Sequence, residues 1–272
     1  MKTVLLPKGV FALSIAFAKH RITENLLQPT PDIIPLRLPQ MTVWIWVHLL
    51  VADISNRKLS ESTLGHNNTH SRRGPTTPME SLITLRTTVI FSMGMSFFFN
   101  SYLPSIAFMI LLWLYNNRGS YTDGPWIRMG LNAIGISFFN QAAARFFLSG
   151  KAAENEKAFL NWYVLMAAVA MTTIHTQEFP DVARDEAQEQ NTSPLMFGDV
   201  FPRRSVAGLV MIWSFISPRF WNASSWDVLV SSVGLGAIIS ALVLLRLGWM
   251  CDQWAWRIWC LWIVSSYLGP LY

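Results

Sequence analysis

The stretch that decides the fold is "QEFPDVARDEA", Gln177 to Ala187, which directly follows the apolar run "NWYVLMAAVAMTTIHT" at positions 161–176. It places Glu178, Asp181 and Asp185 at positions i, i+3 and i+7, so that on a continuous helix the three carboxylates share one face. The apolar run is typical of a helix in a bilayer, which puts the acids at the lipid boundary. Three carboxylates there repel each other unless water solvates them or a cation lies among them.

The composition of the whole chain indicates a membrane protein. Of its 272 residues, 52% are hydrophobic and 14% are charged, whereas soluble domains carry about a quarter charged residues. We therefore predict an all-α integral membrane protein with one domain over residues 1–272. The net charge of +5 does not imply a nucleic-acid partner, because the cytoplasmic loops of membrane proteins concentrate Lys and Arg.

Nine apolar runs are long enough to be membrane spans, since a hydrocarbon core takes ~20 helical residues. Backbone polar groups in lipid have to be paired within their own segment, and the alternation that a barrel needs is missing, so these runs are predicted to be helices. Only "NSYLP" separates the third from the fourth, where Asn100 and Pro104 favour a break. The predicted spans are 3–19, 37–54, 82–99, 102–117, 126–149, 158–176, 205–220, 229–246 and 253–271.

The two longest polar stretches, 55–81 and 177–204, are predicted to lie on the same side of the membrane because four crossings separate them. That side has the larger share of basic residues, namely Arg57, Lys58, Arg72, Arg73, Arg118, Arg184, Arg203, Arg204 and Arg246. The opposite side has mainly Lys19, Arg21, Lys151, Lys157 and Arg219. This excess predicts that the loops with the acidic motif are cytoplasmic.

The spacing of the three acids leaves two interpretations open. Acidic residues at the end of a span are commonly a solvated loop. They can also form a site for a hard divalent ion, because magnesium binds through one or two carboxylates together with substrate phosphates. Pro180 is expected to kink the chain here, since a proline biases the preceding residue away from the α region.

Longer motifs resemble the fungal group of the UbiA superfamily. The segment "QEFPDVARDEAQEQNTSPLMFGDVFPRR" at 177–204, followed by "VAGLVMIWS", is similar to the second signature of that group. "YNNRGSYTDGPWIRMGLNAIG" resembles its Tyr-Asn loop and the following Arg-Asn helix, and "CDQWAWRIWCLWIVSSYLGPL" resembles its closing helix. The matching residues are Tyr115, Asn116, Arg128, Asn132, Gly135, Gln177, Phe179, Asp181, Asp185, Thr192, Pro194, Gly198, Asp199, Arg203 or Arg204, Trp213 and Ser214.

This resemblance implies a bundle of transmembrane helices around a central cavity that binds an isoprenyl diphosphate. In the superfamily, acidic motifs hold Mg²⁺ on the diphosphate, and Lys and Arg add positive charge. Members of the group begin some tens of residues earlier, so an amphipathic lead-in helix is expected to be missing. The resemblance implies catalytic Asp181 and Asp185, metal ligands Asn56, Glu178, Asp181 and Asp185, and substrate-binding Arg72, Arg73, Arg128, Asn132, Arg203 and Arg204.

The first signature of the group is altered in this chain. Arg57 replaces a Gln, and Gly65 and His66 stand where two acids are expected. In the second signature, residues 189–191 (Glu-Gln-Asn) stand where Gly-Arg-Lys is expected, and Glu178 replaces Asp. These changes remove ligands of one metal cluster and two cationic contacts to the diphosphate, for which other arginines could compensate.

Three functions follow from the resemblance and its departures. The first is a terpene cyclase of secondary metabolism using farnesyl or geranylgeranyl diphosphate, which the Gln-x-Phe-x-Asp form and the Tyr-Asn loop favour. The second is a prenyltransferase with an aromatic acceptor, and the third is a membrane protein that kept the fold and lost the chemistry. The tryptophans between Trp249 and Trp262 are interpreted as an interfacial belt, although aromatic faces can also steady a carbocation.

Overall fold

The computed structural model describes residues 33–64, 78–116, 124–145, 156–187, 190–220 and 226–267. Within these ranges every regular element is a helix, as predicted. The predicted first span, 3–19, lies outside the described residues. The elements are α2 (Ile33–Leu64), α3 (Pro78–Phe98), α4 (Tyr102–Leu114), α5 (Pro125–Arg145), α6 (Glu156–Thr173), the 3₁₀ helix η2 (Ile174–Asp181), α7 (Val182–Ala187), α8 (Ser193–Phe197), α9 (Val200–Phe220), α10 (Trp226–Leu245) and α11 (Trp249–Tyr267).

The other predicted spans each fall largely within a long helix. The predicted break between the third and fourth spans is confirmed, because α3 ends at Phe98 and Asn100 takes a left-handed φ of 55° before α4 begins. Among the described residues, two helical segments are both long and apolar enough to cross a membrane, Arg37–Ser55 and Trp226–Leu245. Shorter apolar helices cover Leu82–Phe98 and Tyr102–Leu114.

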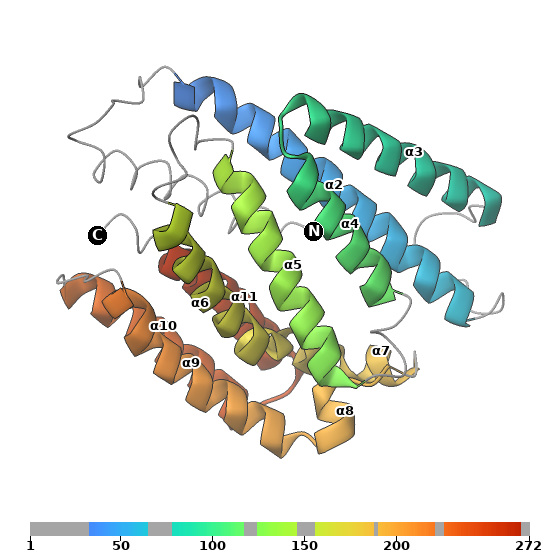
Figure 1. Cartoon of the computed structure of the whole chain (residues 1–272). Helices are drawn as coiled ribbons and strands as arrows, with labels where there is room; N and C mark the ends of the chain where they lie inside the picture. The colour runs from blue at the N-terminus through green and yellow to red at the C-terminus, as the bar shows by residue number, and fades with distance from the viewer. Residues whose placement is uncertain are drawn as a thin grey trace, which may run out of the picture.

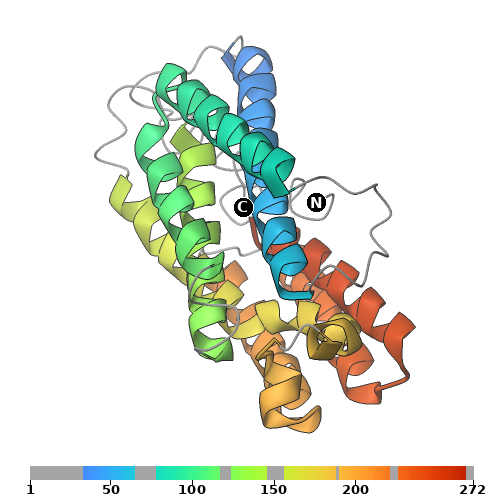
Figure 2. The ribbon, with the colours of Figure 1, turned by 90° about the vertical axis from the view of Figure 1, so that its right-hand side faces the viewer.

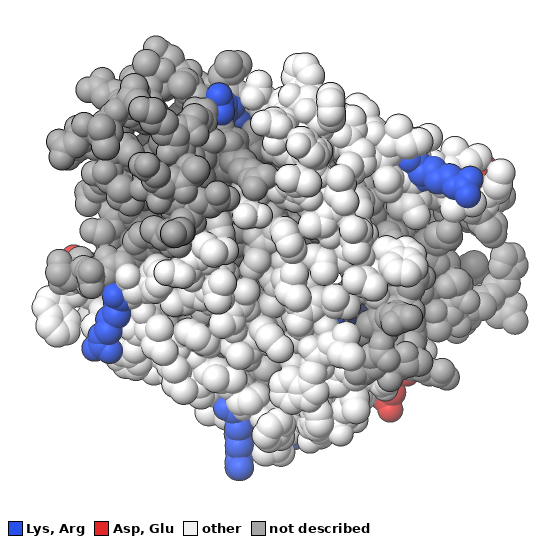
Figure 3. Space-filling view, viewed as in Figure 1, with Lys and Arg blue, Asp and Glu red and all other residues white. Residues whose placement is uncertain are grey.

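Large apolar side chains cover much of the outer surface. Ile90, Phe98 and Trp226 expose 72%, 82% and 77% of their surface, respectively. Figure 3 shows one face that is almost free of charged side chains, with the arginines and acids near its edges. Because soluble monomers rarely expose broad apolar patches, this surface is suited to lipid contact.

The long helices form a bundle in which neighbours along the chain pack together, as Figure 1 shows. α9, α10 and α11 pack in sequence, α5 packs between α4 and α6, and α2 packs on α3. One buried apolar cluster joins α5, α6, η2, α9, α10 and α11 around Trp162, Val210 and Trp262. A second cluster joins α2 and α5 around Trp44 and Phe139.

The acidic motif of the opening stretch lies at one end of this bundle, where the short helices gather. Figures 1 and 2 show α7 and α8 there, beside the first turns of α5 and α9. The kink expected at Pro180 is confirmed: α6 ends at Thr173, a 3₁₀ helix runs to Asp181, and α7 follows. Pro180 lies near the end of this 3₁₀ helix, where it removes one backbone donor and clashes with the preceding turn, so an α-helical ladder cannot run through it. Gly198 then reverses the chain into α9 with a φ of 74°.

Candidate functional site

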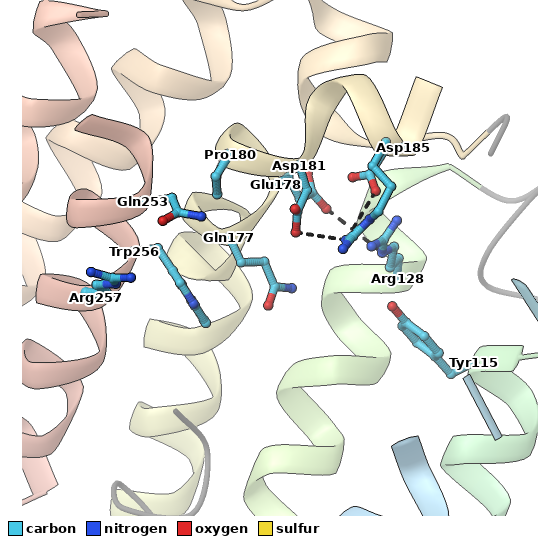
Figure 4. Close-up of a pocket in the computed structure, with 11 residues that line it drawn as sticks. Tyr115, Arg128, Gln177, Glu178, Pro180, Asp181, Asp185, Gln253, Trp256 and Arg257 are labelled. Carbon is cyan, nitrogen blue, oxygen red and sulfur yellow. Dashed lines mark hydrogen bonds and ion pairs between the residues drawn. The ribbon is translucent and has the colours of Figure 1, made fainter. Parts of the chain in front are cut away.

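A cavity of about 340 Å³ lies at this end of the bundle, and we call it the acidic pocket. Three of its residues are the acids of the opening stretch, which η2 and α7 present to the same space (Figure 4). Other walls come from Tyr115, which directly follows α4, and from α5 and α11. The lining residues are Tyr115, Arg128, Gln177, Glu178, Pro180, Asp181, Arg184, Asp185, Gln253, Trp256 and Arg257.

Glu178 is the most constrained of the acids. It exposes only 2% of its surface, and its Oε2 accepts a hydrogen bond of 2.9 Å from the backbone N–H of Ser193. Its Oε1 lies 4.0 Å from Nε of Arg128. Burial raises the pKa of the Glu178 carboxyl, and Arg128 and the Ser193 amide oppose that rise. Glu178 therefore ties η2 to the start of α8 and keeps one oxygen toward a cation.

Arg128, one turn into α5, is the cation that faces Glu178. Its Nη1 donates to the Oε1 of Gln190 at 2.9 Å, while its Nε is buried without a hydrogen-bond partner. Figure 4 shows its guanidinium close to Glu178 and Asp185, with the Tyr115 hydroxyl pointing toward it. The family resemblance led us to expect a cation at position 190. In the structure, Gln190 instead holds Arg128 in place through this hydrogen bond.

Asp181 and Asp185 differ in exposure although both line the pocket. The Asp181 side chain is 41% exposed and accepts a 2.8 Å bond from Nη2 of Arg184. Asp185 exposes 1% of its surface, and its Oδ1 lies 3.7 Å from the same nitrogen and has no hydrogen-bond partner. Burial raises the pKa of the Asp185 carboxyl, against the opposing effect of Arg128 and Arg184.

The carboxylates of the pocket fit a magnesium ion in one respect. The buried Oδ1 of Asp185 lacks a hydrogen-bond donor, and such an oxygen is a ligand that Mg²⁺ prefers, usually with one further carboxylate and phosphate oxygens. Among the carboxylates of the pocket, Asp181 is the one nearest to Asp185 along the chain. Its ion-pair partner Arg184 is exposed and can move away, which would free Asp181 to bind the ion. Within the described part of the chain, no group of three or more His, Cys, Asp or Glu is arranged to hold a metal by itself.

A second cavity of about 340 Å³ adjoins the acidic pocket, and we call it the apolar chamber. Tyr115, Gln177 and Trp256 line both cavities, so these residues form a shared wall. Beyond that wall the lining is mostly aliphatic and aromatic, from α2, α4, α5, α6, η2 and α11. Its further residues are Leu49, Ala52, Phe108, Leu111, Leu112, Leu131, Asn132, Gly135, Ile136, Phe139, Ala170, Ile174, Trp259, Cys260, Ile263 and Tyr267.

The predicted site residues separate into three groups in the structure. Glu178, Asp181, Asp185 and Arg128 line the acidic pocket, and Asn132, one turn after Arg128, lines the apolar chamber. Arg72 and Arg73 lie outside the described residues, as does the altered motif at 65–66.

Asn56 belongs to α2, and its side chain is not among those described. Its neighbour Ser55 accepts a hydrogen bond from Nδ2 of Asn116, next to Tyr115, so this part of α2 lies close to the pocket.

Arg203 and Arg204 line neither cavity. Arg203 is 7% exposed and binds two carboxylates, with Nε 2.5 Å from Oδ1 of Asp199 and a two-pronged contact of 2.5 and 2.8 Å to Asp252. Its guanidinium also lies 4.6 Å from the centre of the Phe179 ring. Arg204 is exposed. The structure thus gives Arg203 a structural role between α9 and α11 in place of the expected contact with substrate.

Several pocket residues were not among the predicted site residues. Gln253, Trp256 and Arg257 all come from α11, and Arg184 comes from α7. The belt interpretation of the α11 tryptophans needs correction for Trp256 and Trp259, which stack at 4.9 Å and both line the apolar chamber. Trp249 and Trp254 expose 60% and 51% of their surface. The signal for this was the spacing: Gln253, Trp256 and Arg257 recur at i, i+3 and i+4, which places them on one face of a helix.

Two motif residues hold the helices together instead of lining a cavity. The indole N–H of Trp213 donates to Thr172 on α6, and that of Trp262 on α11 donates to Ser214. Buried indoles need such acceptors. His175, one turn before the acids, contacts Ser205 on α9 at 3.2 Å and lines neither cavity.

Comparisons with known proteins agree with the family resemblance. No protein-family model matches the chain. Its sequence is 22% identical over 182 residues to a fumagillin beta-trans-bergamotene synthase of Aspergillus fumigatus, an alignment that covers 66% of this chain and 62% of that synthase. The activity of that relative therefore bears on this chain only as a proposal.

The fold is similar to two solved structures. One is a UbiA homologue from Aeropyrum pernix K1, with a TM-score of 0.67, 9% identity, and coverage of 100% of this chain and 98% of that one. The other, from a study of a digeranylgeranylglyceryl phosphate synthase in membranes, has a TM-score of 0.63, 13% identity, and coverage of 99% and 98%. The chain has the UbiA-type fold, and the resemblance to that superfamily and its fungal group is confirmed.

Proposed function

We propose that this protein is a UbiA-type membrane enzyme acting on an isoprenyl diphosphate, and that it is a terpene cyclase. The observation that carries the proposal is the shared wall of Tyr115, Gln177 and Trp256 between a charged pocket and an apolar chamber. An isoprenyl diphosphate has the same two parts, a charged head and an apolar tail. The sequence similarity to a bergamotene synthase supports cyclisation as the reaction.

The residues of the pocket suit the departure of a diphosphate. Asp181 and Asp185 would hold Mg²⁺, which when bound supplies positive charge that stabilises the leaving group. Arg128, Arg184 and Arg257 line the same pocket and bind phosphate oxygens. As the carbon–oxygen bond breaks, its electron pair leaves with the diphosphate and an allylic cation remains in the chamber. The apolar lining excludes water from that cation, and the stacked faces of Trp256 and Trp259 attract it.

A second candidate is transfer of the prenyl group to an aromatic acceptor. Gln177 and Asn132 favour it, because they are polar side chains in an otherwise apolar lining and can hold the polar groups of an acceptor. The first candidate needs no acceptor. The altered first signature leaves the third interpretation, a protein without activity, as an outcome of the experiment.

The test supplies purified protein in detergent with Mg²⁺ and either farnesyl or geranylgeranyl diphosphate, without an acceptor. A released cyclic hydrocarbon is the result expected of a cyclase. Turnover that appears only after a phenolic acid is added would replace cyclisation by transfer. Absence of turnover in both mixtures, with activity gained in the Gly65→Glu, His66→Asp variant, would show that the natural chain has lost the chemistry.

A double variant and a matched control test the role of the acidic pocket. Asp181→Asn with Asp185→Asn should abolish turnover, because both carboxylates line the pocket. Glu186→Gln is the control, since Glu186 is an exposed neighbour on the same short helix and lines neither cavity. Equal activity of the double variant and the control would contradict the proposed role of the pocket.

A further inference from the structure

Gly135 occupies an unusual place in α5, in the middle of the face that lines the apolar chamber. That face consists of Leu131, Asn132, Gly135, Ile136 and Phe139. A glycine inside a helix destabilises it relative to alanine. Gly135 therefore calls for an explanation by packing or by function.

Close packing of helices does not explain this glycine. A Cβ placed on Gly135 meets no atom within 4 Å. Gly236 on α10 is the contrasting case, because a Cβ there would collide with Oγ of Ser214 on α9. Gly236 is thus required by a neighbouring helix, whereas Gly135 leaves open space on the chamber side.

Phe139 lies one turn further along the same face, at the end of the chamber away from the acids. Its ring packs edge-on against Phe108 of α4 at 4.5 Å, and Trp44 lies behind it at 5.4 Å. Phe139 is 1% exposed. Beside it, Nδ2 of Asn140 donates to the Tyr267 hydroxyl at 3.1 Å and so ties α5 to α11. Aromatic side chains from two helices close this end of the chamber.

The distance from the charged head to this closed end can be estimated from helix geometry. Arg128 and Phe139 are separated by about 16 Å along α5, at the ~1.5 Å rise per residue of an α-helix. An extended chain covers ~3.5 Å in three bonds, so an isoprene unit of four main-chain bonds covers ~4.7 Å by the same geometry. Three units then need about 14 Å and four need about 19 Å.

We propose that Gly135 and Phe139 determine the chain length of the isoprenyl substrate and select three isoprene units. Gly135 keeps the middle of the chamber open for the third unit. Phe139, supported by Phe108, stops a fourth unit. This inference rests on the proposed function, because it takes the acidic pocket as the site of the diphosphate.

The experiment measures binding and needs no turnover. Isothermal titration of the purified protein with Mg²⁺ compares geranyl, farnesyl and geranylgeranyl diphosphate, which carry two, three and four isoprene units. The variants are Gly135→Ala, Gly135→Leu and Phe139→Ala. Gly130→Leu is the control for the first two, because Gly130 is in the same helix, has open space around an added Cβ and lines neither cavity. Phe99→Ala is the control for Phe139, since Phe99 packs on the same cluster outside the chamber.

The expected result is a shift in preference by length. Farnesyl diphosphate should bind the natural protein at least about tenfold more tightly than geranylgeranyl diphosphate, because a fourth unit would overpack the end of the chamber that Phe139 closes. Gly135→Ala should weaken the affinity for farnesyl diphosphate slightly, and Gly135→Leu should weaken it by about tenfold. Both variants should leave the affinity for geranyl diphosphate nearly unchanged. Phe139→Ala should remove the discrimination against the fourth unit. Neither Gly130→Leu nor Phe99→Ala should change the order of affinities for the three diphosphates.

The outcomes separate this inference from the proposed function. Binding of all three diphosphates with a preference that Gly135→Leu and Phe139→Ala do not change would overturn the role of these two residues and leave the proposed function standing. Absence of binding of any diphosphate to the natural protein would overturn both. Thermal midpoints of the variants identify misfolding, and Gly135→Ala is expected to be at least as stable as the natural chain because it removes a helical glycine.

Discussion

Asp185 combines two properties that rarely occur together in one side chain. It exposes 1% of its surface, yet its Oδ1 has no hydrogen-bond donor. We expect Asp185→Asn to weaken magnesium-dependent binding of farnesyl diphosphate by about tenfold or more, since a neutral amide is a poor ligand for a hard cation. Titration with Mg²⁺ and with EDTA measures this. Equal affinities of the variant and the natural protein under both conditions would contradict a metal at Asp185.

The raised pKa values of Glu178 and Asp185 predict how stability depends on pH. For a carboxyl whose pKa is raised on folding, the contribution to stability is complete below the ordinary pKa and is lost as pH rises through the raised value. The ordinary values are 4.5 for Glu178 and 3.8 for Asp185. In EDTA, the thermal midpoint should therefore fall as pH rises above this range.

Magnesium should offset this loss and should do so more strongly at higher pH, because protons compete with the ion for the same oxygens. Asp185→Asn should flatten the fall in EDTA and reduce the effect of Mg²⁺. The measurement is a series of melting curves from acid to neutral pH for both proteins. A thermal midpoint of the natural protein that rises over this pH range relative to that of Asp185→Asn would contradict a raised pKa at Asp185.

At the scale of elements, a buried ion pair joins the start of α9 to the start of α11. Arg203 binds both oxygens of Asp252 and also Asp199, and Asp199 contacts Arg246 at 2.6 Å. Removing one partner of a buried pair leaves the other charge uncompensated, at about 3–5 kcal/mol. We expect Arg203→Met to destabilise the fold by roughly that amount, whereas Arg204→Ala, at an exposed position, should stay within about 0.5 kcal/mol.

The Arg203→Met variant also separates a structural role from a binding role for Arg203. Below its lowered melting temperature, Arg203→Met should bind farnesyl diphosphate with nearly the affinity of the natural protein, because Arg203 lines neither cavity. Titration at low temperature measures this. A stable Arg203→Met protein that no longer binds the diphosphate would restore the contact with substrate that the sequence motif led us to expect.

At the scale of the whole molecule, the excess of basic residues predicts a cytoplasmic acidic pocket. Glu186 is exposed beside the pocket, and Asp227 is exposed at the first turn of α10, on the opposite side by the predicted spans. In a Cys251→Ser, Cys260→Ser background, a membrane-impermeant maleimide should label Asp227→Cys in intact cells. Glu186→Cys should be labelled only after the membrane is opened. The reverse pattern would invert the topology.

The helical elements of this protein follow from its sequence because their signals are local. Apolar runs mark the long helices, Asn100 marks the turn before α4, and Pro180 marks the end of η2 before α7. The acids of the pocket and Arg128 could also be named in advance, since their spacing and the family resemblance involve residues close in the chain.

The partners of those residues were decided by the tertiary structure alone. Arg203 and Asp252 are far apart in the chain, and so are Arg128 and Gln190, so no spacing in the sequence indicates that they meet. The α11 tryptophans show the same limit: their pattern defines a helix face, but only the packing of α11 against η2 turns that face toward the cavities. Sequence by itself determined which segments are helical and where charge gathers, because hydropathy and local sterics act on each segment separately. Only the tertiary structure decided which charges neutralise one another and which side chains enclose the chamber. Both depend on contacts between distant helices, and these contacts exist only in the folded bundle.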